Sequence, residues 1–246
     1  MNGIRATLAR ELRAYFFSPL AYAVLTFFLL INGFVFWLIV SFLSNPRSPG
    51  GAPAELFFGQ TVFFWLVLLL ITPAVTMRLL AEERRSGTIE VLMTAPVTET
   101  QVVLGKYFAA LVFYAFLWLP TLIYVGFLAR YSTVDWGTIG SSFLGILAIG
   151  AVFLAVGVFA SSVSRNQVVA ASLAFAILIL LFSFGLLENL FNQPWLKQAF
   201  SYLDVWSHME DFSKGIVNTR RLVYCVSLSA FFLFLSARSL ETNKWR

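Results

Sequence analysis

The chain has 246 residues, of which 59% are hydrophobic and only 12% are charged, and its mean hydropathy is +0.83. An ordinary soluble domain carries about 25% charged residues, so this composition excludes a soluble globular protein. The net charge of +5 is expected to reflect membrane topology and not nucleic-acid binding, because no soluble domain is predicted that could carry a basic surface.

The first predicted element is a helix over residues 3–18. Its apolar side chains fall on one helical arc, and Arg10 and Arg13 lie on the opposite side. Pro19 follows the helix and favours a break in the chain there. Since arginines are costly at membrane depth, we expect a helix that lies in the membrane interface, and not an extension of the first span.

Six apolar segments follow, each long enough to cross a bilayer, which takes about 20 residues. None of them contains Asp, Glu or Lys, and backbone groups in hydrocarbon must pair within a helix. The predicted spans cover residues 20–43, 57–77, 107–129, 139–161, 168–187 and 222–240. The predicted fold class is therefore an all-α polytopic membrane protein, a single transmembrane domain over residues 1–246.

The distribution of basic residues predicts the orientation of these spans. With six spans, both termini lie on the same side, and that side collects 11 of the 17 Lys and Arg residues. Basic residues are enriched in cytoplasmic segments. We therefore expect both termini, and the loop between the second and third spans, to lie in the cytoplasm.

This loop, residues 78–106, holds eight of the chain's 29 charged residues. The second span continues into it as a helix, and Gly87 can end that helix because glycine adopts positive φ at little cost. Thr88 can cap a short transverse helix over residues 89–94, and Pro96 stops that helix.

Thr98 and Gln101 have the spacing of a capping box and predict the start of a return helix into the third span. So many helix boundaries in a short loop favour a rigid helical structure over a solvated connector. The sequence thus predicts a rigid loop that contacts something outside the membrane.

The long connection over residues 188–221 lies on the external side in this topology. Apolar and aromatic residues alternate with polar ones in it, which predicts short amphipathic helices folded onto the membrane face. His208, the only histidine, follows Asp204 by four residues, so both share a face if the segment is helical. Two interpretations remain open there: a metal or proton site, or a local helix pair.

Small residues recur every four positions near the fourth span, which allows close helix packing either within the chain or between subunits. They are Gly137, Ser141 and Gly145.

Several functional classes find no support in the sequence. There is no phosphate-binding loop of the type Gly-x-x-x-x-Gly-Lys-Ser/Thr, and no Cys/His cluster with metal-ligand spacing. The predicted spans hold no carboxylate of the kind that proton- or sodium-coupled carriers use at mid-membrane. An intramembrane enzyme is disfavoured because no catalytic cluster lies at a common depth.

The loop also carries a family resemblance. Its residues read Glu82-Glu83-Arg84-Arg85-Ser86-Gly87-Thr88-Ile89-Glu90-Val91-Leu92, then Ala95-Pro96-Val97, then Gly105-Lys106. This pattern resembles the cytoplasmic loop of type-2 ABC transporter permeases. Features of the external segment and the C-terminus resemble the branch that includes gliding-motility-associated permeases, namely Asp204, His208, Phe212, Gly215 and Lys244-Trp245-Arg246.

The resemblance implies a transport subunit of the bacterial cytoplasmic membrane, with export as the habit of the family. It implies a dimer with a second copy or a homologous permease, and a separate cytoplasmic ATPase that binds ATP and Mg, so that this chain needs no cofactor and is no enzyme. The lipid bilayer is a partner, an accessory periplasmic or membrane protein is left open, and nucleic acid is not expected. The alternatives are a non-transporting membrane anchor of a motility or secretion complex and, less favoured, a secondary carrier.

The resemblance also implies roles for individual residues. Glu82 and Glu83 would hold the corner and pair with basic residues, and Lys106 would fix the return helix near the lipid headgroups. The predicted ATPase-coupling residues are Glu82, Glu83, Arg84, Gly87, Thr88, Ile89, Leu92, Pro96 and Lys106, and Arg10 and Arg13 belong to the interfacial helix.

Overall fold

The computed structural model describes residues 2–45, 53–87, 97–131, 135–187, 193 and 202–243, and these residues are helical with no strand among them. The helices up to the loop are α1 (Asn2–Phe16), α2 (Pro19–Leu43), α3 (Pro53–Glu55), the π-helical turn η1 (Leu56–Gln60), α4 (Val62–Thr76) and α5 (Ala81–Arg85). The later ones are α7 (Glu99–Trp118), the 3-10 turn η2 (Leu119–Thr121), α8 (Leu122–Tyr131), α9 (Trp136–Val163), α10 (Gln167–Leu187), α12 (Val205–Ser213) and α13 (Thr219–Asn243).

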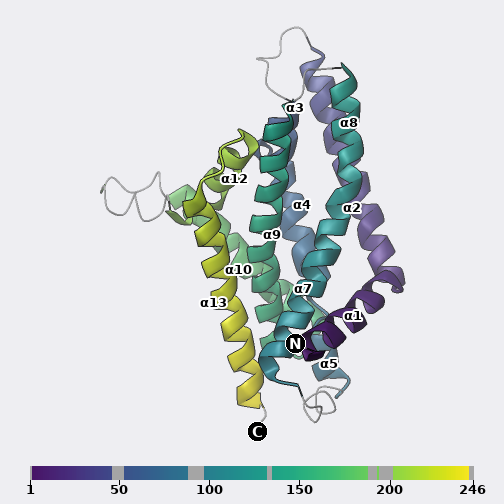
Figure 1. Cartoon of the computed structure of the whole chain (residues 1–246), viewed down its shortest axis with the longest axis vertical. Helices are drawn as coiled ribbons and strands as arrows, with labels where there is room; N and C mark the ends of the chain where they lie inside the picture. Colours follow the sequence, from purple (N-terminus) through teal and green to yellow (C-terminus); the bar gives the residue numbers. More distant parts are fainter. Residues whose placement is uncertain are drawn as a thin grey trace.

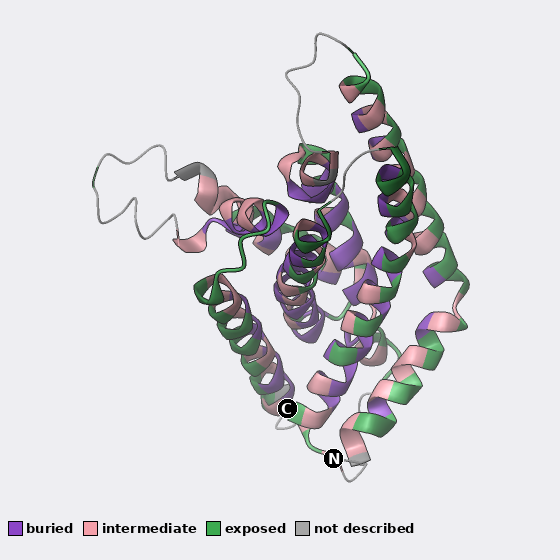
Figure 2. Cartoon of the chain, turned by 45° about the horizontal axis from the view of Figure 1, so that its top comes forward, coloured by how far each residue is buried: buried purple, intermediate pink, exposed green. Residues whose placement is uncertain are grey.

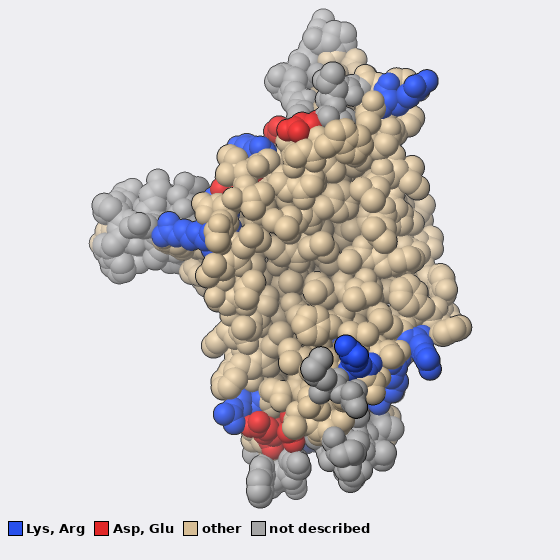
Figure 3. All heavy atoms as spheres, in the orientation of Figure 1, with Lys and Arg blue, Asp and Glu red and all other residues tan. Residues whose placement is uncertain are grey.

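The described residues contain six helical segments that are long and apolar enough to cross a membrane, which confirms the predicted number and class. They are α2, α4 with α5, α7 with α8, α9, α10 and α13. Charged residues gather at the two ends of the molecule, and the visible band between them is almost free of charge (Figure 3). This is the distribution that a bilayer requires of a protein that spans it.

Helix α9 forms the centre of the bundle and contacts α4, α7, α10, α12 and α13. In an apolar stretch of 18 residues in its span 67% of the residues are buried, against 22% in the corresponding stretches of α2 and α10. Figure 2 shows buried residues on the helix faces that point inward and exposed residues along the outer faces. Glycines make the central position possible: a Cβ at Gly150 would lie 2.2 Å from the Tyr114 ring, and one at Gly157 would lie 2.0 Å from Thr76 Oγ1.

Helix α1, helix α5 and the last turns of α13 lie at the same end of the bundle, here called the terminal end (Figure 1). Helices α3 and α12 lie toward the opposite end (Figure 1). The arrangement agrees with six crossings of the chain between its first and last helices.

The second span begins five residues later than predicted, at Val62 and not at Phe57. Phe58 (φ −98°, ψ 35°) and Gly59 (φ 146°) leave the helical conformation, and Thr61 is extended. Glycine tolerates this positive φ without the clash that a Cβ would cause. The apolar residues before Val62 therefore form a separate short turn, although hydropathy alone joins them to the span.

The external segment also differs from its prediction. Helix α12 is amphipathic as expected, but it packs among α9, α10 and η1 and does not lie apart on a membrane face. Ser141 Oγ donates to the Phe212 carbonyl at 2.6 Å, and a Cβ at Gly145 would lie 2.6 Å from Phe212 Cβ. Ser141 and Gly145 thus serve packing within the chain.

Candidate functional site

A buried lysine joins three helices at the terminal end. Lys106 of α7 has a side chain only 1% exposed, and its Nζ lies 2.9 Å from Oε1 of both Glu11 and Glu83. Arg10 Nη2 lies 2.8 Å from the same two carboxylate oxygens. Glu11 and Arg10 belong to α1 and Glu83 belongs to α5, so two cations and two carboxylates tie α1, α5 and α7 together.

The position of Lys106 corrects the prediction that it anchors the return helix near the headgroups. Its charge is turned inward because α1 covers this part of α7. Gly105 makes that approach possible, since a Cβ there would lie 2.7 Å from Thr7 Cβ and 3.2 Å from the Ile4 carbonyl oxygen. Gly105 therefore allows α1 to approach α7 closely, and Lys106 supplies the cation that pairs with the carboxylates at the same contact.

The electrostatics of this network favour the ionised form of the Glu11 carboxylate. Burial by itself raises the pKa of Glu11, but the charges and hydrogen bonds of Lys106 and Arg10 outweigh it, so the pKa lies below its usual value. Removing one partner of a buried ion pair typically costs about 3–5 kcal/mol, because the remaining charge is left unpaired. The network therefore resists separation of the helices it joins.

Tyr15 fixes α1 to the bundle at a second point. Its hydroxyl donates to the Val75 carbonyl oxygen at 2.7 Å, and its ring stacks on Phe113 with centroids 4.7 Å apart. The Arg78 guanidinium lies 4.8 Å from the centroid of the Tyr15 ring and donates to Ser18 Oγ at 3.0 Å. The sequence does not predict the contacts of Tyr15 and Arg78, since their partners Val75 and Ser18 each lie 60 residues away.

The interfacial helix of the prediction is thus a helix that packs on α7 through Thr7 and Tyr15, both of them buried. Arg10 joins the ion-pair network, whereas Arg13 is exposed and stays outside it.

The start of α5 is held by a serine from the central helix. Ser161 Oγ accepts from the backbone N–H groups of Leu80 and Ala81 at 3.0 Å each, and donates to the Met77 carbonyl oxygen at 3.1 Å. The backbone groups freed between α4 and α5 are thereby paired, as buried groups must be. The sequence gives no signal for this contact, because Ser161 lies about 80 residues away.

The corner of the loop follows the prediction as far as the structure describes it. Gly87 has φ 71°, and Ser86 Oγ donates to the Glu82 carbonyl oxygen at 2.9 Å. The Glu82 carboxylate accepts a hydrogen bond from Gln167 at the start of α10. Thr88, Ile89, Leu92 and Pro96, and with them the predicted transverse helix, lie outside the described residues.

The predicted capping box is confirmed at the start of α7. Thr98 Oγ1 accepts from the Gln101 N–H at 3.3 Å, and Gln101 Oε1 accepts from the Thr98 N–H at 3.4 Å. Arg84, the remaining member of the predicted set, donates to the Val163 carbonyl oxygen at 3.4 Å.

Around His208 at the opposite end, the structure shows a packed histidine. Asp204 caps the start of α12 by accepting from the Trp206 and Ser207 N–H groups, and the His208 ring packs edge-to-face on Tyr224 at 4.8 Å. Burial lowers the pKa of His208 to about 4, and the charge of Arg221 acts in the same direction. Among the described residues no group of three His, Cys, Asp or Glu side chains could hold a metal ion.

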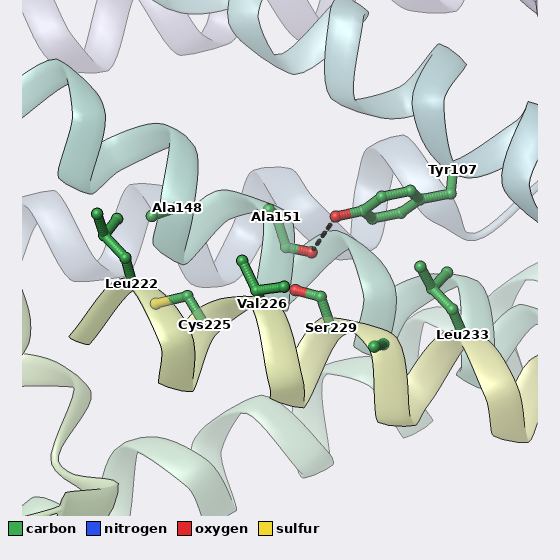
Figure 4. Close-up of a pocket in the computed structure, with 9 residues that line it drawn as sticks. Tyr107, Ala148, Ala151, Leu222, Cys225, Val226, Ser229 and Leu233 are labelled. Atoms are coloured by element: carbon green, nitrogen blue, oxygen red, sulfur yellow. Dashed lines mark hydrogen bonds between the residues drawn. The ribbon is translucent and has the colours of Figure 1, made fainter. Parts of the chain in front are cut away.

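A groove of about 240 Å³ lies between α7, α9 and α13 in the uncharged band (Figure 4). Its polar side-chain groups are few, and the Tyr107 hydroxyl already donates to the Ala151 carbonyl oxygen at 3.3 Å. The groove offers apolar surface and small side chains, and no charged group lines it. Its lining includes Tyr107, Ala148, Ala151, Cys225, Val226 and Ser229.

The family model described as "ABC-2 family transporter protein" matches residues 51–238, which include the second to fifth spans and most of the sixth. No curated protein matches the chain.

Proposed function

Since the chain belongs to the ABC-2 family of transporter proteins, we propose that it is the permease subunit of an exporter that a separate cytoplasmic ATPase drives. The chain itself is a membrane transport component and not a catalyst. ATP and Mg would bind to the ATPase, in keeping with the lack of a phosphate-binding loop in this sequence.

One observation carries this proposal: the Lys106 network connects helices α5 and α7 to α1. Both helices belong to the loop over residues 78–106, α5 wholly and α7 with its first turns. A force that the ATPase applies to the loop would move α5 and α7, and the buried ion pairs would pass that movement to α1. The three helices would then act as one lever on the spans above them.

A second permease copy completes the proposed transporter. Helices α2 and α10 bury few of their residues in the single chain and expose large apolar side chains, so an apolar face is available to another subunit or to lipid. The assignment to the gliding-motility branch is part of the proposal and is supported by the resemblance of the external segment.

The orientation with both termini in the cytoplasm is supported by the excess of basic residues at that side. Its test uses single cysteines at Ser48 and Asn243 in a Cys225→Ser background. A membrane-impermeant thiol reagent applied to intact cells should label Ser48→Cys and leave Asn243→Cys unlabelled. The reverse pattern would show that the loop faces the outside and would overturn the ATPase coupling.

The coupling itself is tested at Gly87, whose positive φ a β-branched residue adopts poorly. Among the described residues nothing lies within 4 Å of a Cβ there, and Gly87→Val adds backbone strain of about 1–3 kcal/mol. Gly126→Val in α8 is the matched control, because its Cβ also meets nothing within 4 Å and it lies far from the loop.

At equal membrane expression, Gly87→Val should retain less of the co-expressed ATPase than the wild type on purification, and Gly126→Val should retain as much. If no ATPase copurifies even with the wild type, the permease assignment fails and a non-transporting membrane anchor becomes the better explanation. If Gly87→Val retains the ATPase and full coupled turnover, the loop is only a connector.

A further inference from the structure

The groove between α7, α9 and α13 is lined by short side chains on two neighbouring helices. Ala148 and Ala151 belong to α9, and Cys225 and Ser229 belong to α13, so a space stays open between the helices although they are in contact. Ala230, on the α13 side of the groove, is exposed, so the groove opens to the outside of the bundle. Because α9 and α13 are spans, that open side belongs to the surface that faces lipid.

The groove is long and narrow. Its lining along α13 runs from Leu222 to Leu233, which is about 16 Å at 1.5 Å per residue (Figure 4). With a volume of about 240 Å³, its mean cross-section is about 15 Å². A helix with its side chains is about 10–12 Å wide and cannot enter this space. Carbon atoms in contact lie about 3.5–4.0 Å apart, so a single hydrocarbon chain fits.

The lining selects an apolar occupant. Among the described residues that line the groove none is charged, and the Tyr107 hydroxyl already donates to the Ala151 carbonyl oxygen at 3.3 Å. An ordered water needs about two to four polar partners, which this lining does not offer. An empty groove would forfeit the dispersion contacts of its walls. Hydrocarbon from the surrounding bilayer is therefore the occupant that the chemistry of the groove favours.

The position of the groove along α13 indicates one leaflet. Helix α13 begins at Thr219, away from the terminal end, and Leu222 lies three residues into it (Figure 1). The length of the groove, about 16 Å, is close to half of a hydrocarbon core of about 30 Å. A chain that enters beside Leu222 and follows α13 would therefore reach the middle of the membrane near Leu233.

We propose that this groove is a binding site for one acyl chain of a phospholipid, from the leaflet at the end opposite the terminal end. The site recognises the chain and not the headgroup, because its lining is uncharged. The bound chain fills the contact between α13 and Tyr107, the residue that follows Lys106, and so supports α7 next to the ion-pair network. This inference needs the six spans and does not depend on the ATPase.

Native mass spectrometry of the purified chain in detergent tests the site by counting bound palmitoyl-oleoyl phosphatidylcholine during a titration. The wild type should bind one lipid per chain more tightly than all later ones. Ala230→Phe places a ring in the groove and should weaken this first binding about five-fold or more. Ser227→Phe is the matched control, because Ser227 is exposed on the same helix and does not line the groove, and it should bind within about two-fold of the wild type.

Ala148→Phe fills the same groove from α9 and decides the test if Ala230→Phe fails to fold. Photo-cross-linking of the wild type needs no variant at all. Phosphatidylcholine with a diazirine in its acyl chain, added at one lipid per chain, should label α13 between Val226 and Leu233 and α9 near Ala151. Labels spread evenly over the outward faces of the spans would show ordinary boundary lipid and overturn the proposal, as would equal binding by Ala230→Phe and Ser227→Phe.

Other lipids separate the chain from the headgroup. Dihexanoyl phosphatidylcholine should bind more weakly, because its short chains leave much of the groove empty, and phosphatidylglycerol should bind as phosphatidylcholine does. A preference for phosphatidylglycerol that survives Ala230→Phe would reveal a headgroup site, and binding of palmitate without phosphatidylcholine would reveal a site for free fatty acid. If the wild type binds no lipid and Ala230→Phe breaks the association of two chains, the groove receives another subunit. Each of these three results would overturn the proposal.

Discussion

Replacing Lys106 by methionine should destabilise the protein strongly, although Met has a similar length. The substitution removes the cation that lies 2.9 Å from both Glu11 and Glu83 and leaves two carboxylates beside each other. Breaking a buried ion pair costs about 3–5 kcal/mol. The expected cost lies near the lower limit, about 3 kcal/mol, because Arg10 still contacts both carboxylates and the Glu side chains are 13% and 17% exposed.

Thermal unfolding of the purified chain in detergent measures this cost. For a protein of this size, 1 kcal/mol shifts Tm by about 2–4 °C, so Lys106→Met should lower Tm by about 6–12 °C. The control is Arg238→Met, which breaks an exposed pair with Glu241 and should cost less than about 1 kcal/mol.

Adding Glu83→Gln to Lys106→Met should recover part of the loss, since one stranded carboxylate becomes neutral. If the double variant is no more stable than Lys106→Met, or if Lys106→Met costs no more than Arg238→Met, the network does not hold α1 to the bundle.

The same network predicts a pH dependence. The folded-state pKa of Glu11 is lowered: burial alone would raise it, but Lys106 and Arg10 outweigh the burial. A lowered pKa contributes stability above the unfolded-state value, about 4.3 for Glu, and that stability is lost as the pH falls through the folded-state value. The Tm of the wild type should therefore fall on acidification below about pH 4.3. In Lys106→Met the fall should be smaller, because protonation relieves the repulsion between the carboxylates.

Three further outcomes are expected. Gly145→Ile should destabilise the protein by about 1–3 kcal/mol through overpacking, and so lower Tm, because a Cβ at this position would lie 2.6 Å from Phe212 Cβ. A Tm like that of the wild type would mean that α12 does not pack there. His208 has a pKa lowered by burial to about 4, so the folded state resists protonation and loses stability as the pH falls from about 6.5 toward 4. His208→Gln should show a smaller fall of Tm between these pH values, and equal falls would contradict the buried neutral histidine. The purified chain without ATPase should hydrolyse ATP at background rate only, and robust turnover would refute the proposed division of labour.

The spans, the helix class and the capping box at Thr98 could be predicted because they depend on local sequence. About twenty consecutive apolar residues form a helix in a bilayer, because their backbone groups must pair within the segment. A Thr followed three residues later by Gln can cap the start of a helix, because each side chain accepts a hydrogen bond from the backbone N–H of the other residue. The positive φ at Gly87 was predictable for the same reason, since the helix before it has to end at a corner and glycine is the residue that allows this conformation.

The partners of charged and small residues could not be predicted in this way. A lysine at the membrane end of a span suggests an interfacial anchor, and only the approach of α1, 95 residues earlier, turns Lys106 into a buried ion-pair centre. Helix α12 has the pattern of a surface helix, and its burial depends on glycines at positions 59 and 145 that receive Met209 and Phe212. Periodicity shows that a helix has an apolar face but not which surface covers it.

The Lys106 network also decides how a displacement of the loop reaches the spans. Separating α1 from α5 and α7 would leave a buried charge unpaired, at about 3 kcal/mol or more. Bending at residues 77–80, or at Leu119–Thr121, breaks none of these ion pairs. The response of lower free energy is therefore a joint rotation of α1, α5 and the adjoining turns of α7, with bending above them. If the network is lost, ATPase should stay bound to the loop, but transport-coupled ATP turnover should fall. This result would distinguish transmission of movement by α1, α5 and α7 from docking of the ATPase.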